Sequence, residues 1–168
     1  MGKYESPKYE LIMNNANFEL RKYAPFYTTS VIEKNLKGYS GFGLLFGYIS
    51  GENEKREKMN MTVPVINQFD KDQITMEFVI PSSVALSQIP DPINSNIKIK
   101  HYPEMTTAVI CFSGNTGPRR VEQMKNQLSD WIELMHFEII GNYRLARYNP
   151  PFSLPFLRKN EILVEVKA

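Results

Sequence analysis

The hydrophobic periodicity of the chain changes from strand-like to helical and back, and it does so twice in the same order. In the first half, runs rich in aromatic and β-branched residues predict strands on either side of a helical segment. The helix is expected from Tyr39 to Ser50, because the apolar residues there recur at three- and four-residue spacing. The predicted strands of this half are Tyr9–Ile12, Phe18–Tyr23, Phe26–Ile32, Met61–Asn67 and Ile74–Ile80.

The second half repeats this order of elements. A helix is predicted to begin at Pro118, since the fixed φ of proline suits the first turn of a helix. The residues expected on its buried face are Val121, Met124, Leu128, Ile132 and Met135. The predicted strands are Ile97–Tyr102, Thr106–Phe112, Tyr143–Tyr148 and Glu161–Val166.

Short stretches of similar residues support a duplication. Lys22–Pro25 is similar to His101–Glu104, and Thr28–Ile32 is similar to Thr106–Ile110. Neither half has a complete core of its own, so the halves are expected to share one sheet system that both helices cover. The sequence therefore predicts an α+β fold made of two strand-strand-helix-strand-strand halves, with pseudo-repeats at about 9–81 and 97–166 in a single domain spanning 1–168.

Charge and cysteine content narrow the classes of function. Twenty basic residues against eighteen acidic residues give a net charge of +2, and they are scattered, which argues against nucleic acid as a partner. The single cysteine, Cys111, excludes an internal disulfide and fits a reducing compartment. It lies in an apolar run, which predicts a buried, inert thiol. With neither a signal-like segment nor a run of ~20 apolar residues, the protein is expected to be cytoplasmic, without a transmembrane segment.

Motifs for catalysis or metal binding are sparse. The two histidines, His101 and His136, are not arranged in a zinc or protease motif, and both are expected at the surface. Glu77 is the acid with apolar residues on both sides, but strand alternation predicts that it faces water. An enzyme acting on a small hydrophobic substrate would need Glu77 to point into a groove with a raised pKa.

A proline-stiffened loop precedes the last predicted strand. Pro150, Pro151 and Pro155 exclude a helix there, because each lacks a backbone donor and restricts the residue before it. The loop is nevertheless apolar and ends on an Arg-Lys pair, which suits one wall of a site for an amphipathic ligand. The alternative is a loop that only caps a core.

The first helix is unusual in containing three glycines. Gly41, Gly43 and Gly47 each cost about 1 kcal/mol of helix stability relative to alanine. They favour either close approach of a flat ligand or tight packing of helix on sheet. Met59 and Met61, which follow, share one face if extended, and this face suits an aromatic ligand or the core. Docking of this helix on a membrane or a partner is a further alternative, although its mixed-charge flank disfavours anionic lipid.

Several motifs in order resemble the SOUL/haem-binding-protein family, from Tyr9 to Val166. They are FELRKYAPFYTTSV, SGENEKREKMNMTVPV, FVIPSSV, IPDP, ICFSG and RYNPPFSLPFLRKNE. The resemblance implies a distorted antiparallel β-barrel of two pseudo-symmetric halves with two flanking helices. A more distant likeness connects the chain with small-molecule-sensing domains of the gyrase-inhibitor-like kind.

The family resemblance implies non-enzymatic binding of haem or another porphyrin, for buffering, transport or sensing. Its apolar groove would lie between the first helix and the proline-rich loop, with basic residues at the rim for the propionates. Lys22 stands where some members carry a histidine proposed to ligate iron, so we expect no His ligation from that position. The alternative is a gyrase-inhibitor-like domain that binds or hydrolyses a non-porphyrin hydrophobic ligand. The candidate residues are Phe42, Leu45, Phe46, Ile49, Lys58, Met59, Met61, Phe152, Phe156, Leu157, Arg158 and Lys159.

Overall fold

The computed structural model describes residues 4–33, 40–150 and 152–168. In this part of the chain there are ten strands and two α-helices, which follow the predicted order except for one added strand, β8, and two short 3₁₀ segments. The helices are α1 (Ser40–Ile49) and α2 (Pro118–Leu134), and the 3₁₀ segments are η1 (Leu86–Gln88) and η2 (Pro155–Leu157). The strands are β1 (Tyr9–Asn15), β2 (Phe18–Tyr23), β3 (Phe26–Glu33), β4 (Val65–Gln68), β5 (Ile74–Val79), β6 (Lys98–Tyr102), β7 (Met105–Phe112), β8 (Glu138–Ile139), β9 (Arg144–Arg147) and β10 (Asn160–Lys167).

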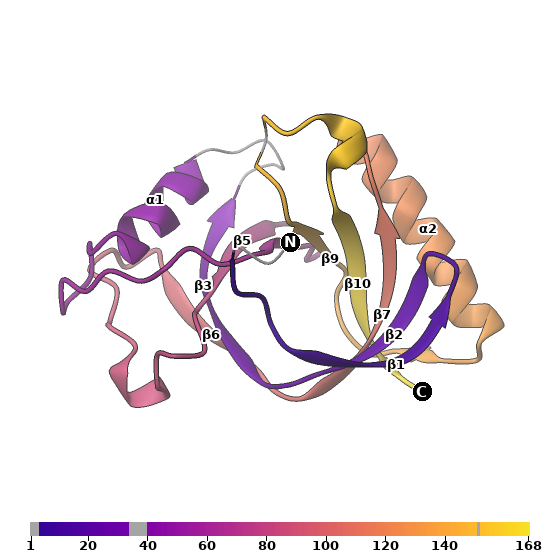
Figure 1. Ribbon diagram of the computed structural model, residues 1–168, viewed down its shortest axis with the longest axis horizontal. Helices are drawn as coiled ribbons and strands as arrows, with labels where there is room; N and C mark the ends of the chain where they lie inside the picture. Colours follow the sequence, from indigo (N-terminus) through magenta and orange to yellow (C-terminus); the bar gives the residue numbers. More distant parts are fainter. Residues whose placement is uncertain (1–3, 34–39, 151) are drawn as a thin grey trace.

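The strands form one curved antiparallel sheet to which both halves contribute (Figure 1). Its order is β1-β2-β7-β10-β9-β4-β5-β3-β6, and β8 adds to β10. Three pairings join the halves, because strands β2, β4 and β3 of the first half pair with β7, β9 and β6 of the second, respectively. Among the described residues, the end strands β1 and β6 are not paired with each other, so the expected closure into a barrel is not shown.

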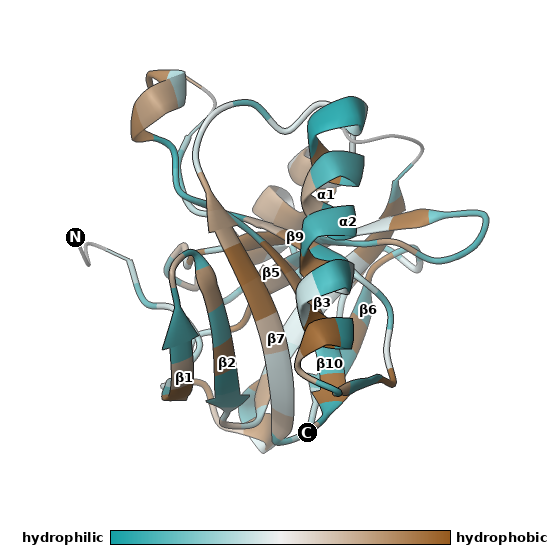
Figure 2. Ribbon diagram, turned by 90° about the vertical axis from the view of Figure 1, so that its right-hand side faces the viewer, coloured by the Kyte–Doolittle hydropathy of each residue, from teal (hydrophilic) through white to brown (hydrophobic). Residues whose placement is uncertain are grey.

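Both helices cover the outer face of the sheet, as expected (Figure 1). Helix α1 packs against β3 and β5, and α2 packs against β7 and β10. The exposed side of α2 is hydrophilic in Figure 2, whereas its inner side contributes Val121, Leu128 and Trp131 to the core. The core beneath α1 contains Leu45 and Phe78. In the described chain, no helix is both long and apolar enough to cross a membrane.

A few element boundaries differ from the prediction. The strand expected at Met61–Asn67 begins only at Val65, because Thr62 and Val63 instead contact the N-terminal segment. Strand β1 runs on to Asn15, so the expected turn at 14–17 shrinks to two residues. In that turn Ala16 has φ of 55°. The two-residue strand β8 was not predicted, and Tyr39 lies outside the described residues.

No helix of the described residues lies on the inner, concave face of the sheet (Figure 1). Residues Tyr4–Lys8, which we call the N-terminal segment, lie across it. The Glu5 carbonyl accepts a hydrogen bond from the Val63 amide at 2.9 Å, and the Glu5 carboxylate accepts one from the Ser82 amide at 2.7 Å. At the other end, the Ala24 amide donates to the Lys8 carbonyl at 3.0 Å. The sheet therefore has helices on one face and this segment on the other.

Candidate ligand-binding site

Helix α1 exposes two of its four candidate residues. Phe42 is 39% exposed and Phe46 is 49% exposed, and their rings stack with centroids 6.0 Å apart. The edge of one ring is anchored, since Phe42 meets Phe78 of β5 at 5.2 Å. Leu45 and Ile49 are buried in the core beneath the helix. We call Phe42 and Phe46 the α1 surface.

The start of α1 is fixed by a buried carboxylate of β3. Glu33 accepts hydrogen bonds from the Gly41 amide at 2.9 Å and from the Ser40 hydroxyl at 3.2 Å, which satisfies groups that a helix N-terminus leaves unpaired. A Cβ on Gly41 would collide with this carboxylate, and a Cβ on Gly47 would collide with the carboxylate of Glu52. Tight packing therefore explains these two glycines.

The methionine segment continues from α1 along its inner side. The Met59 amide donates to the Ile49 carbonyl at 2.8 Å. Met59 and Met61 are half-buried and pack against the core cluster that contains Leu45. Lys58 is exposed beside them. Most of the methionine surface thus serves the core, which is the commoner use of this residue.

The proline-rich loop turns its large apolar side chains outward. It contains η2, which the Gly114 amide holds by a 2.9 Å hydrogen bond to the Pro155 carbonyl. In Figure 2 the η2 coil stands at the top of the view, coloured as hydrophobic. The exposed fractions are 88% for Phe152, 56% for Leu154, 71% for Phe156 and 63% for Leu157, and we call these four residues the loop surface. A loop that only caps a core would bury these side chains.

The basic residues that end the loop make local contacts. The Arg158 Nε donates to the Ser153 carbonyl at 2.9 Å. The Lys159 Nζ lies 3.9 Å from a Glu161 carboxylate oxygen and 4.4 Å from the centre of the Tyr148 ring. Arg158 is therefore held within the loop, whereas the Lys159 ammonium is directed toward Glu161 and Tyr148 of the concave face.

The α1 surface and the loop surface are held by different parts of the sheet. Helix α1 packs on β3 and β5, whereas η2 is held near Gly114, beside the start of α2. In Figure 1, α1 and η2 stand on either side of the same end of the molecule.

Lys22, at the position of the possible iron ligand, is exposed and pairs with Glu104 at 3.5 Å. Within the described ranges, no three His, Cys, Asp or Glu side chains gather as a metal site.

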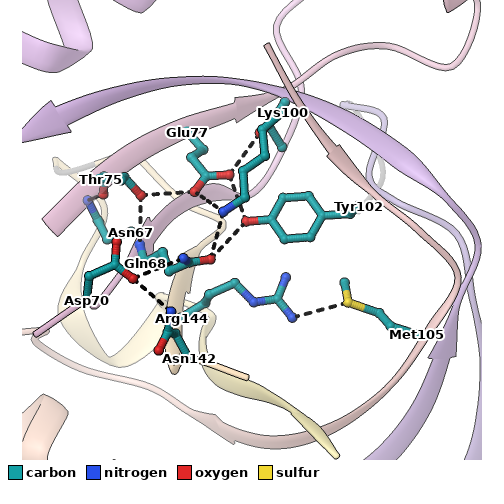
Figure 3. A network of polar contacts seen from close by, with 11 residues as sticks. Asn67, Gln68, Asp70, Thr75, Glu77, Lys100, Tyr102, Met105, Asn142 and Arg144 are labelled. Atoms are coloured by element: carbon teal, nitrogen blue, oxygen red, sulfur yellow. Dashed lines mark hydrogen bonds and ion pairs between the residues drawn. The ribbon is translucent and has the colours of Figure 1, made fainter. Parts of the chain in front are cut away.

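The prediction that Glu77 faces water was wrong. Its side chain is fully buried on the concave face, where Figure 3 shows it in a polar network. The carboxylate accepts hydrogen bonds from Thr28 and Tyr102 at 2.8 Å and from Thr75 at 2.9 Å, and Lys100 lies at 3.5 Å. The alternation was correct, but the face opposite α1 is enclosed by the curved sheet instead of meeting water.

A second polar network on the concave face was not predicted. The Arg21 guanidinium donates to both carboxylate oxygens of Glu161, at 3.0 and 2.7 Å, and to Glu19 at 2.8 Å. The Tyr148 hydroxyl donates to Glu161 at 2.7 Å. Cys111 is only half-buried beside these groups. Burial, together with the carboxylates of Glu161 and Glu19, raises the pKa of the Cys111 thiol to about 12, consistent with the expected inert thiol.

Comparison with known proteins agrees with the family resemblance of the sequence motifs. A family model described as SOUL heme-binding protein matches residues 4–165. The protein named Heme-binding protein 2 of Mus musculus is 31% identical over 192 residues, covering 99% of this chain and 90% of that protein. Its namesake from Homo sapiens is 32% identical over 158 residues, covering 87% of this chain and 76% of that protein.

Solved structures share the fold at low sequence identity. The C-terminal domain of EcmrR superposes with a TM-score of 0.68 at 13% identity, covering 95% of this chain and 98% of that one. A hydrolase from Listeria innocua superposes with a TM-score of 0.64 at 13% identity, covering 93% and 94% of the two chains. These likenesses show the α+β fold alone.

Proposed function

The chain belongs to the SOUL heme-binding protein family, and on that premise we propose that it binds haem or a related tetrapyrrole at the α1 surface and the loop surface. The observation that carries the proposal is the loop surface, where four large apolar side chains are each more than half exposed. Proteins seldom leave such a patch uncovered unless it binds something. The role is non-enzymatic: buffering, transport or sensing of the ligand.

The size of the apolar contact supports useful affinity. Burying about 400 Å² of apolar ligand surface gains roughly 10 kcal/mol before the cost of association. After that cost, a dissociation constant on the order of micromolar remains. Such affinity requires no bond from a side chain to the metal.

The polar groups of this region suit the edge of a porphyrin. Arg158 is held within the loop, Lys159 follows it in the chain, and Lys58 is exposed directly before Met59. Arginine is the strongest partner for a propionate, because its fork donates two parallel hydrogen bonds. The thioether sulfurs of Met59 and Met61 are candidate iron ligands, but both side chains are half-buried against the core. Apolar contact and charge therefore hold the ligand, and any iron chemistry is supplied by the ligand itself.

A hydrolytic function is not favoured at this site. It would require an acid or base there, and Glu77 lies on the opposite face of the sheet with Thr28, Thr75 and Tyr102 already donating to it. A carboxylate whose oxygens already accept several hydrogen bonds is poorly placed to take a proton from a substrate.

The test compares haemin with metal-free protoporphyrin IX. Binding is followed by the shift of the Soret band and by quenching of Trp131 fluorescence. We expect the two dissociation constants to lie within about threefold of each other, because no side chain bonds the iron. The double variant Phe152→Ala, Phe156→Ala should weaken the binding of both porphyrins about tenfold or more, because each substitution removes part of the apolar contact. Leu134→Ala, which removes a side chain that is 72% exposed at the end of α2, is the matched control. Equal binding by the double variant and the control would exclude the loop surface.

A further inference from the structure

Arg144 is a buried cation for which the described part of the chain supplies no paired carboxylate. It lies on β9, opposite Leu163 of β10 and Gln68 of β4, and its side chain is directed to the concave face (Figure 3). Only 5% of it is exposed. Its guanidinium donates to the Met105 sulfur at 3.8 Å and lies 5.0 Å from the centre of the Tyr102 ring.

Among the described residues, no carboxylate lies within 4.0 Å of the Arg144 guanidinium. The carboxylates of the concave face are already engaged, since Glu77 pairs with Lys100 and Glu161 pairs with Arg21. The neighbouring phenols do not supply a charge either, because burial raises the pKa of Tyr102 and of Tyr23. Within the described residues, the Arg144 charge is therefore buried without a carboxylate partner.

A buried charge without a partner is costly for a fold, so its presence calls for an explanation. Sulfur and an aromatic ring are weak partners for a guanidinium, whose five donors match the two oxygens of a carboxylate. Arg21, on the same face, shows the satisfied arrangement with both oxygens of Glu161. An anion supplied from outside would complete Arg144 in the same way.

Two adjoining cavities offer room for one oxygen of such an anion at Arg144 and for a tail beyond it, because the nearer cavity holds about one water-sized atom. A small cavity of about 10 Å³ is lined by Arg144 and Tyr23, and a larger one of about 310 Å³ lies between the N-terminal segment and the loop after β5. Pro7 and Phe26 line both cavities. Much of the larger wall is apolar, with Val79, Ile80, Val84 and Leu86 among its residues. The pair of cavities thus offers a cationic end and an apolar end.

We propose that the concave face binds a small monocarboxylate with a short alkyl tail, its carboxylate on Arg144 and its tail beside Pro7 in the larger cavity. This site is separate from the α1 surface and the loop surface, which lie outside the concave face. The N-terminal segment forms part of its wall.

The first experiment measures calorimetric affinities for acetate, butanoate and hexanoate at constant ionic strength. We expect the affinity of the protein to rise by roughly fourfold for each methylene added. Arg144→Met should reduce hexanoate affinity at least tenfold. Arg147→Met, on the same strand but directed to the other face, where it contacts Asn67 at 2.6 Å, should leave it unchanged. Equal loss in both variants, or binding of inorganic phosphate in place of hexanoate, would overturn the proposal.

A second experiment on the unaltered protein keeps the proposal testable even if Arg144→Met does not fold. With hexanoate at saturation, we expect nuclear Overhauser contacts from its methyl group to the Phe26 ring and a shift of the Tyr102 ring signals. Contacts to Phe152 or Phe156 instead would place the fatty chain on the loop surface and refute the concave site. That outcome leaves haem binding unaffected, so the two proposals fail separately.

Discussion

At the scale of single residues, the environment of Cys111 determines its reactivity. Burial and the carboxylates of Glu161 and Glu19 raise its thiol pKa from 9.0 to about 12. At pH 9 the folded protein therefore holds about a thousandth of its thiol as thiolate, the form that reacts. Alkylation by iodoacetamide from pH 7 to 10 should be about a hundredfold or more slower in the folded protein than in urea. Rates within tenfold of each other at pH 9 would contradict this.

The burial of polar side chains in the strands could not be predicted from the sequence. The alternation of β5 correctly separated Glu77 from Phe78, but a strand pattern does not tell which polar face meets water. That depends on the curvature of the sheet and on the N-terminal segment, which involve residues far apart in the chain. Arg144 and Arg21 were missed for the same reason, since a lone arginine in a strand gives no signal of burial.

At the scale of elements, the glycines of α1 offer a matched pair. Gly41→Ala should destabilise the protein by about 1–3 kcal/mol, because the new Cβ displaces the Glu33 carboxylate that caps the helix. Gly43→Ala should stabilise it by about 0.5–1 kcal/mol, since a Cβ there meets open space and alanine favours the helix. Urea unfolding measures both changes, and equal signs for the two variants would show that the cap is not the cause.

Elements were also the level at which the sequence was most informative. The periodicity located both helices and most strands, because amphipathic faces repeat along the chain within each element. The proline-rich loop was correctly kept out of helix, apart from the short η2. The pairing of β2 with β7 and of β4 with β9 could not be predicted from spacing, since neither pair is joined by a hairpin.

At the scale of the whole molecule, the shared sheet predicts cooperative unfolding. Leu45 is fully buried under α1, and Trp131 lies in the separate cluster under α2. Leu45→Ala should lower the free energy of unfolding by about 2–5 kcal/mol. Because strands of both halves alternate in the sheet, the loss should be the same by Trp131 fluorescence and by circular dichroism. A shift in the circular dichroism alone would mean that the halves unfold independently.

The two faces of the sheet have a consequence for how such a protein diverges. The side chains of the loop surface project from the loop between β9 and β10. The charged networks lie on the concave face, which is the face opposite the helices. Substitutions in one set therefore need no compensating change in the other. A lineage can change the side chains of the loop and retain the same folded scaffold, or alter the concave lining and keep the loop as it is.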